Sequence, residues 1–143
     1  MNTIPKIIKG NKHSDARGTL IYNNEFLATE IKRVYFIQNA EIDYVRGWQG
    51  HQIEQRWFSV VQGSFKIKTR KIDNWETPSK YLSEEIFVLL ENTFDVLFVP
   101  KGFVTSLQAL EKNSKLMAMS DYSMGEIQDE HRIDINYFKI ETC

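Results

Sequence analysis

One stretch of the chain decides how the rest of the sequence is interpreted: Arg46-Gly47-Trp48-Gln49-Gly50-His51-Gln52-Ile53-Glu54-Gln55-Arg56-Trp57-Phe58. It contains two arginines, two tryptophans, a glutamate and one of the three histidines of the chain, arranged around two glycines. Gln49 and His51 are two residues apart, so in a regular strand their side chains point to the same face. The stretch therefore predicts β-structure that carries a concentrated polar cluster.

Outside this stretch, short apolar runs follow one another with the pattern of strands. Residues 64–68 alternate between polar and apolar side chains, as a strand with one solvated face does. Further runs rich in β-branched, aromatic or other apolar residues predict strands at 31–37, 56–61, 85–90, 95–99 and 115–119. Turn residues separate them at 62–64, 73–74, 91–92, 100–102 and 111–113. Only residues 127–133 are compatible with a short helix, so we expect an all-β fold, a sandwich or a closed double-sheet jelly roll.

Composition limits the classes of function. The chain has 143 residues, which predicts one domain over 1–143 with a substantial buried core. Its formal net charge of −1 provides no bulk field for nucleic acid or anionic membranes, so an anion site must be a local cluster of arginines. The lone Cys143 permits no intrachain disulfide, and no apolar run has the length of a membrane span. We expect a soluble, cytoplasmic protein without nucleic-acid or membrane partners.

Aromatic residues make up 13% of the chain, a high share for a small domain. Most are expected to fill the core of the β-structure and a dimer interface. Trp48 and Trp57 flank the polar cluster, and they are the candidates for stacking against a nucleotide base or a sugar. Trp75, in a predicted loop, is either a lid or a contact with a partner.

Two segments resemble the motifs of metal-binding cupins. Gln49-Gly50-His51 is similar to the first motif, which contains His-x-His, and residues 100–105 are similar to the second, Pro-x-Gly-x-x-His. Gln49 and Thr105 stand where two of the three histidines are expected. One histidine and the nearby Glu54 are too few ligands to select a transition metal. We therefore expect neither a metal nor another cofactor.

The chain resembles more closely the metal-independent cupins that act on dTDP-4-keto-6-deoxyhexoses. It is similar to dTDP-4-dehydrorhamnose 3,5-epimerases and, more closely, to dTDP-4-keto-6-deoxyglucose 3,4-ketoisomerases. Four segments in the family's order carry the resemblance: Asp15-Ala16-Arg17-Gly18, Ile31-Lys32-Arg33-Val34-Tyr35, Arg46-Gly47-Trp48-Gln49-Gly50-His51 and Ser120-Asp121-Tyr122. The resemblance implies a cupin-type double-stranded β-helix (jelly roll) and an isomerase of a sugar nucleotide in deoxysugar biosynthesis.

The sequence also departs from this family at two positions. The ketoisomerase motif resembles Arg-Gly-Phe-His-Ala-His, and here its first histidine is Gln49. The epimerases place their catalytic base at that histidine and a second site histidine where this chain has Thr105. Three readings stay open: a 3,4-ketoisomerase, a 3,5-epimerase, and a catalytically degenerate cupin that binds a sugar nucleotide as a sensor or partner subunit.

His51 is the candidate proton carrier. Isomerisation next to a ketone needs a base whose pKa lies near the working pH, and an imidazole meets this requirement without strong tuning. Gln49 can donate an amide N–H to the enolate oxygen that forms. The alternative is that His51 is a hydrogen-bonded structural residue at a strand end. His13 and His131 lack this context, and we interpret both as surface residues.

Arg17, Arg46 and Arg56 are the candidates for binding the diphosphate, because a guanidinium is always charged and donates in a fork. Arg46 and His51 differ in strand parity, so a bulge at Gly47 or Gly50 is needed to aim both inward. The alternative is that some of these arginines form structural ion pairs with Glu54 or Asp15. Tyr122 matches the family's active-site tyrosine and is predicted to protonate or polarise the 4-oxygen; the alternative is a buried tyrosine.

Assembly is predicted from the edges of the sheets. Small jelly rolls leave edge strands that need covering. The apolar N-terminal segments around residues 7–8 and 20–22 can pair with the sheet of a neighbour. We therefore expect a two-fold symmetric homodimer, which the resemblance also implies.

Overall fold

The structure is a computed structural model that describes residues 3–139, and it confirms the all-β prediction. Its strands are β1 (Lys6–Ile8), β2 (Asn11–Asp15), β3 (Gly18–Tyr22), β4 (Arg33–Ile37), β5 (Val45–His51), β6 (Arg56–Gln62), β7 (Ser64–Lys71), β8 (Glu85–Leu90), β9 (Val96–Val99), β10 (Phe103–Ala109), β11 (Lys115–Ser120) and β12 (His131–Arg132). A single 3₁₀ turn, η1 (Ala28–Glu30), is the only helical element in this part of the chain. None of its helices is long and apolar enough to cross a membrane.

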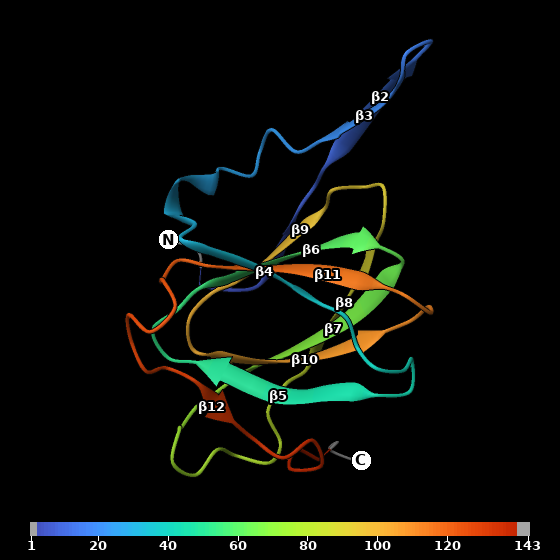
Figure 1. Ribbon diagram of the computed structural model, residues 1–143. Coiled ribbons are helices and arrows are strands. Elements are labelled where there is room, and N and C mark those ends of the chain that lie inside the picture. The colour runs from blue at the N-terminus through green and yellow to red at the C-terminus, as the bar shows by residue number, and fades with distance from the viewer. Residues whose placement is uncertain (1–2, 140–143) are drawn as a thin grey trace.

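Two five-stranded antiparallel sheets form the body of the molecule (Figure 1). The first sheet has the order β1-β9-β6-β11-β4, and the second has the order β12-β5-β10-β7-β8. Strands that are neighbours in space are mostly distant in sequence, which is the winding of a jelly roll. The hairpin of β2 and β3 forms a separate two-stranded sheet that projects away from both (Figure 1).

The main core fills the space between the two sheets. On β7 the alternation predicted from the sequence puts Phe65 and Ile67 fully inside, whereas Lys66 and Lys68 point to the outer face. Phe58 on β6 and Leu97 on β9 meet them from the first sheet. Burial of each such side chain contributes roughly 1.5–3 kcal/mol, so this alternation is enough to fix which face of each strand points inward.

Both tryptophans of the decisive stretch lie outside this core. Trp57 packs with Val96, Phe98 and Met119 on the outer face of the first sheet. Trp48 packs with Ile72 and Val104 on the outer face of the second sheet. Both tryptophans, the candidates for stacking against a nucleotide base or a sugar, thus lie in packed clusters separate from the main core, and that stacking role stays a prediction.

Strand β5 contains a bulge that orients the polar cluster. Thr105 on β10 pairs with Gln49, but Leu107 pairs with Arg46, so two residues of β5, Gly47 and Trp48, lie opposite Ser106 alone. The extra residue restores the parity between Arg46 and His51. Of the two positions expected for a bulge, Gly47 and Gly50, the structure has it at Gly47.

One local prediction needs correction, and a second stays untested. Residues 127–133 form no helix, because Asp129 is held in an extended loop by contacts to another segment and His131 begins β12. Strand β1, with Ile7 and Ile8, pairs with β9 on one side and forms an edge of its sheet, so its pairing with a neighbouring molecule stays a prediction. Strand β3, with Leu20, pairs only with β2 among the described residues and remains available to another molecule.

Candidate active site

The inner face of β5 brings Gln49 and His51 together, as predicted. Across the strand pair, Gln49 lies opposite Thr105 and His51 lies opposite Phe103, whose ring belongs to the main core. Both side chains therefore point to the interior of the double sheet. His51 is 8% exposed and Gln49 is half-buried.

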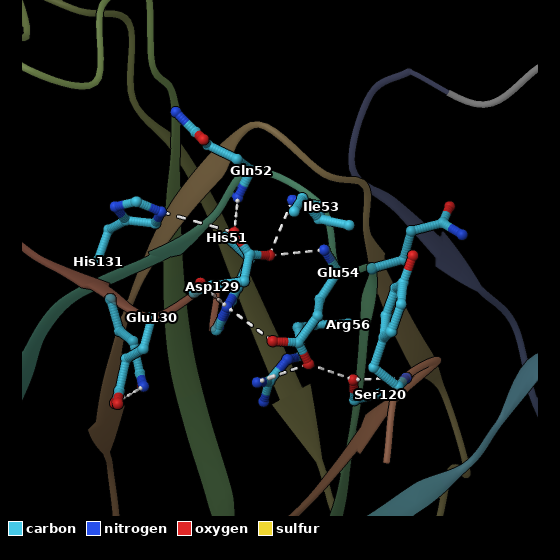
Figure 2. A network of polar contacts seen from close by, with 12 residues as sticks. His51, Gln52, Ile53, Glu54, Arg56, Ser120, Asp129, Glu130 and His131 are labelled. Atoms are coloured by element: carbon cyan, nitrogen blue, oxygen red, sulfur yellow. Dashed lines mark hydrogen bonds and ion pairs between the residues drawn. The ribbon is translucent and has the colours of Figure 1, made fainter. Parts of the chain in front are cut away.

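Asp129, which the sequence did not single out, closes the end of this strand (Figure 2). Its backbone oxygen lies 2.9 Å from His51 Nδ1. Its buried carboxylate accepts hydrogen bonds from the backbone N–H groups of Gln52, Ile53 and Glu54, at 2.9, 2.8 and 2.8 Å. A loop aspartate about 77 positions from its partners leaves no pattern in the sequence, so only the fold reveals it.

The contacts of His51 determine its tautomer. A backbone carbonyl can only accept, so the 2.9 Å contact to Asp129 requires a proton on Nδ1. Burial lowers the pKa of His51 from its ordinary value of 6.5, and the Arg56 cation lowers it further, against the opposite effects of Asp129 and Glu54. The imidazole is therefore neutral at neutral pH, with its lone pair on Nε2. A base with these properties can accept a proton.

Glu54 links His51 to a buried network (Figure 2). One carboxylate oxygen lies 3.4 Å from His51 Nδ1. The other accepts a hydrogen bond of 2.5 Å from Ser120 Oγ and lies 3.3 Å from Arg56 Nη2. The lowered pKa makes the His51–Glu54 contact one between a neutral imidazole and a carboxylate.

Arg56 points into the interior, but it is buried and its guanidinium is already hydrogen-bonded to other side chains. Its Nη1 donates to the Tyr35 hydroxyl at 2.5 Å and its Nη2 faces Glu54. Arg17 lies at the tip of the hairpin, where it pairs with Asp15 at 2.7 Å and its side chain is 90% exposed. The structural ion pairs named as the alternative thus form at both arginines.

On the inner side, Arg46 and Arg33 have fewer interactions with other side chains than Arg56 has. Arg46 shares a face with Leu107, is exposed, and has no hydrogen bond or ion pair among residues 3–139. Arg33 lies opposite Ser120 and stacks on the Tyr35 ring at 4.4 Å. Arg33 was part of a motif quoted from the sequence but was not chosen as a binding residue; its stacking on Tyr35 becomes visible only in the fold.

Gln49 is tied to a second polar group. Its amide nitrogen donates to Glu130 Oε1 at 2.5 Å, and the same oxygen accepts from Arg132 Nη2 at 2.8 Å. The hydrogen bond from Arg132 is the largest cause that lowers the pKa of Glu130. One N–H of the Gln49 amide is thereby used, and the other remains for a ligand.

The structure places the remaining candidates away from His51. Trp48, on the outer face, packs edge-on against Phe138 and under the Arg70 guanidinium. Trp57 and Tyr122 line a groove of about 890 Å³ that also borders Phe98, on the outer side of the first sheet. Within residues 3–139, the side chains of Trp48, Trp57 and Tyr122 form no hydrogen bond with the polar cluster.

Trp75 and His131 cover the outer face of β5. Their rings lie 4.8 Å apart, and the Trp75 ring approaches Gly50 so closely that a Cβ there would meet it at 2.8 Å. His131 Nε2 also lies 3.5 Å from Asp129 Oδ1. The interpretation of His13 as a surface residue is confirmed by its exposure, whereas His131 is only partly exposed and contacts the cluster.

His51, Glu54 and Asp129 are the residues that could hold a metal, since one donor atom of each lies within 4.8 Å of the others. The donors do not fit that role as they are arranged. The Asp129 carboxylate already accepts three backbone N–H groups, Glu54 faces Arg56 and Ser120, and His51 Nδ1 carries a proton. The buried Arg56 guanidinium beside the Glu54 carboxylate would also repel a divalent cation.

Comparison with known proteins agrees with this architecture. The family model for the WxcM-like C-terminal domain (FdtA) matches residues 3–139. A comparison with curated protein sequences gave no match.

Among solved structures, the 3,4-ketoisomerase QdtA from Thermoanaerobacterium thermosaccharolyticum is similar. It was solved as a histidine-to-asparagine mutant with TDP-4-keto-6-deoxyglucose (TM-score 0.67, 21% identity, 86% of this chain and 83% of that chain). The WlaRB TDP-quinovose 3,4-ketoisomerase from Campylobacter jejuni gives a TM-score of 0.68 at 23% identity, over 90% of this chain and 92% of that chain. The dTDP-4-dehydrorhamnose 3,5-epimerase from Bacillus anthracis gives 0.70 at 18% identity, over 96% and 86%. At these identities the likeness establishes the fold and confirms the cupin-type jelly roll.

Proposed function

Because the chain belongs to the FdtA family of WxcM-like C-terminal domains, we propose that it is a sugar-nucleotide isomerase acting on a dTDP-4-keto-6-deoxyhexose, as a 3,4-ketoisomerase. The observation that carries the proposal is the state of His51. It is buried on the inner face of β5, neutral, and protonated on Nδ1, so Nε2 is free to take a proton.

The chemistry needs one base. A ketone at C4 acidifies the proton on C3, and His51 Nε2 removes it to give an enediolate whose charge lies on the C4 oxygen. The hydroxyl proton moves from the C3 oxygen to the C4 oxygen, and His51 returns its proton to C4. The product is the 3-keto, 4-hydroxy isomer, with no atom gained or lost.

Glu54 and Gln49 have supporting roles in this proposal. When His51 takes the proton it becomes an imidazolium, and the Glu54 carboxylate 3.4 Å from Nδ1 stabilises that charge. The remaining N–H of the Gln49 amide can donate to the enediolate oxygen. Double epimerisation at C3 and C5 asks for groups on both faces of the sugar, and Thr105 cannot replace a second imidazole there.

The diphosphate is proposed to bind Arg46 and Arg33. Arg46 is exposed, inward-facing and without a protein partner among the described residues, so binding an anion breaks no ion pair. The Arg33 guanidinium stacks on the Tyr35 ring, and this restraint reduces the side-chain entropy that is lost when it binds a phosphate. Arg17 lies far along the hairpin and can reach such a site only in another copy of the chain (Figure 1).

An NMR experiment tests the proposal directly. The protein is incubated with dTDP-4-keto-6-deoxyglucose in deuterated water, and the proton spectrum is followed. We expect deuterium at C3 of the substrate and a new 3-keto product. Deuterium at C5 would instead identify an epimerase.

A binding protein without turnover is the second candidate. It is favoured by the commitment of Gln49 to Glu130 and Arg132, and by Thr105 in place of a histidine. Its signature is the absence of deuterium at any carbon in the same experiment, together with saturable binding of dTDP in a separate titration.

A further inference from the structure

All three oxygen atoms of Asp129 contact the segment that begins with His51. Its backbone oxygen faces His51 Nδ1, and its carboxylate accepts from the three successive N–H groups of residues 52–54. The residue is 3% exposed, so these bonds form without competition from water. Figure 2 shows the side chain between the loop that follows β5 and His131.

We propose that Asp129 is a positioning residue for the reaction: it fixes the Nδ1–H tautomer of His51 and thereby presents Nε2 to the substrate. This inference rests on the proposed function for its catalytic meaning, but the tautomer is a property of the free protein. Asp129 itself touches no reacting atom in this scheme.

The geometry separates this role from ordinary loop stabilisation. A carboxylate that only anchored a loop would leave the imidazole free to choose its tautomer. Here the carboxylate fixes the loop from Gln52 to Glu54, and the backbone oxygen of the same residue accepts the histidine proton. The two contacts are rigidly linked because they come from one residue, so a shift of the carboxylate also moves the acceptor of Nδ1–H.

The surroundings hold Asp129 from the other side. His131 Nε2 lies 3.5 Å from its Oδ1, and the His131 ring stacks on Trp75. Glu54 is the only other carboxylate within the cluster of His51 and Asp129 in residues 3–139, and Arg56 and Ser120 restrain it. Of these contacts, the one from His131 directly restrains the Asp129 carboxylate.

The test combines a spectroscopic readout with kinetics. In the wild-type protein, nitrogen-15 chemical shifts of the His51 ring are expected to show a protonated Nδ1 and an unprotonated Nε2 at neutral pH. Asp129→Asn replaces one acceptor oxygen by an NH₂ group that faces N–H donors. We expect mixed tautomers in this variant, a loss of kcat of about tenfold or more, and a KM within about twofold of wild type.

Asp134→Asn is the matched control, since Asp134 is an exposed turn residue whose carboxylate accepts only from the Asn136 N–H in the described chain. It should keep the tautomer and kcat. A wild-type spectrum with the proton on Nε2 would overturn the proposal, even if the Asp129 variant did not fold. So would an Asp129→Asn protein that melts earlier but keeps tautomer and kcat. If the wild type were inactive on the keto sugar but showed the Nδ1–H tautomer that Asp129→Asn perturbs, the proposed function would fail and the positioning of His51 would stand.

Discussion

Arg46 and His51 point to the same side of β5 although five positions separate them, because the bulge at Gly47 and Trp48 adds one residue between them. In a regular strand their side chains would lie on opposite faces. The bulge therefore puts Arg46, which has no hydrogen bond or ion pair within residues 3–139, and the candidate base along one interior surface. A sugar nucleotide needs this combination, with charge for its diphosphate and a base for its sugar.

The first prediction follows from the absence of a protein partner for Arg46 in the described part of the chain. Arg46→Ala should weaken binding of dTDP about tenfold, because it removes one charge-assisted contact to phosphate. Titration calorimetry with dTDP measures the effect. Lys112→Ala, which removes an exposed cation from a turn, is the control and should leave the dissociation constant unchanged. Equal affinity in both variants would exclude Arg46 from the site.

The second prediction concerns assembly. On the outer face of the first sheet, Val34 and Phe36 of the edge strand β4 are 53% and 59% exposed, and the β2–β3 hairpin projects with Leu20 63% exposed. We expect these surfaces to be covered in a two-fold homodimer. Light scattering at micromolar concentration should give the mass of two chains.

Phe36→Arg should shift this equilibrium to monomers, because a charge would have to be buried at the interface. Tyr81→Arg, at a comparably exposed aromatic position elsewhere, should leave the dimer intact. A stable wild-type monomer would contradict the prediction.

The third prediction is a pH dependence. Burial and Arg56 lower the pKa of His51 from 6.5, so protonation of the base in the folded protein sets in at a pH below this value. The decrease of kcat/KM on the acid side should therefore have its midpoint below pH 6.5. The same shift affects stability. The unfolded chain binds the proton more tightly, so the free energy of unfolding is full above pH 6.5 and decreases as the pH falls toward the folded-state pKa.

Denaturation in urea between pH 7 and pH 5, compared with His51→Asn, measures this contribution. The variant lacks the titrating group and should lose less stability over that range. Parallel pH profiles for the two proteins would refute the shift.

The fold and the side chains on the inner face of β5 could be predicted from the sequence, but the hydrogen-bond network around Asp129 could not. The alternation at Phe65 and Ile67 and the parity of Gln49 and His51 are local properties, and the structure reproduces both. Asp129 is bound to residues 51–54 across the fold, and nothing near it in the sequence indicates those partners. The same contacts explain why the helix expected at 127–133 does not form.

The outer aromatic residues could not be assigned from the sequence for a related reason. Trp48 and Trp57 border the polar cluster along the chain, but alternation turns them away from it. Tyr122 follows the end of β11 and turns toward the groove with Trp57, opposite to Ser120. Their roles as substrate-binding or catalytic residues stay untested predictions, and the geometry favours packing roles for the two tryptophans.

The fourth prediction is that activity needs no metal. His51 Nδ1 and the carboxylates of Glu54 and Asp129 are already engaged by protein hydrogen-bond and ion-pair partners, so a divalent ion at this cluster would have to displace those contacts. Dialysis against a chelator should leave the isomerisation rate unchanged, and elemental analysis should find no stoichiometric transition metal. A metal lost together with activity would overturn this expectation.

The fifth prediction assigns the proton transfer to His51. His51→Asn and His51→Ala should lower turnover by about a hundred- to ten-thousand-fold, the usual contribution of one positioned general base. Binding of dTDP should stay near wild type, because the diphosphate is expected at Arg46 and Arg33. The Asn variant keeps a donor toward the Asp129 carbonyl and is expected to fold, whereas the Ala variant leaves that carbonyl without its partner. Deuterium incorporation at C3, followed by NMR, is the measurement. An unchanged exchange rate in both variants would remove His51 from the mechanism and leave the binding-protein candidate ahead.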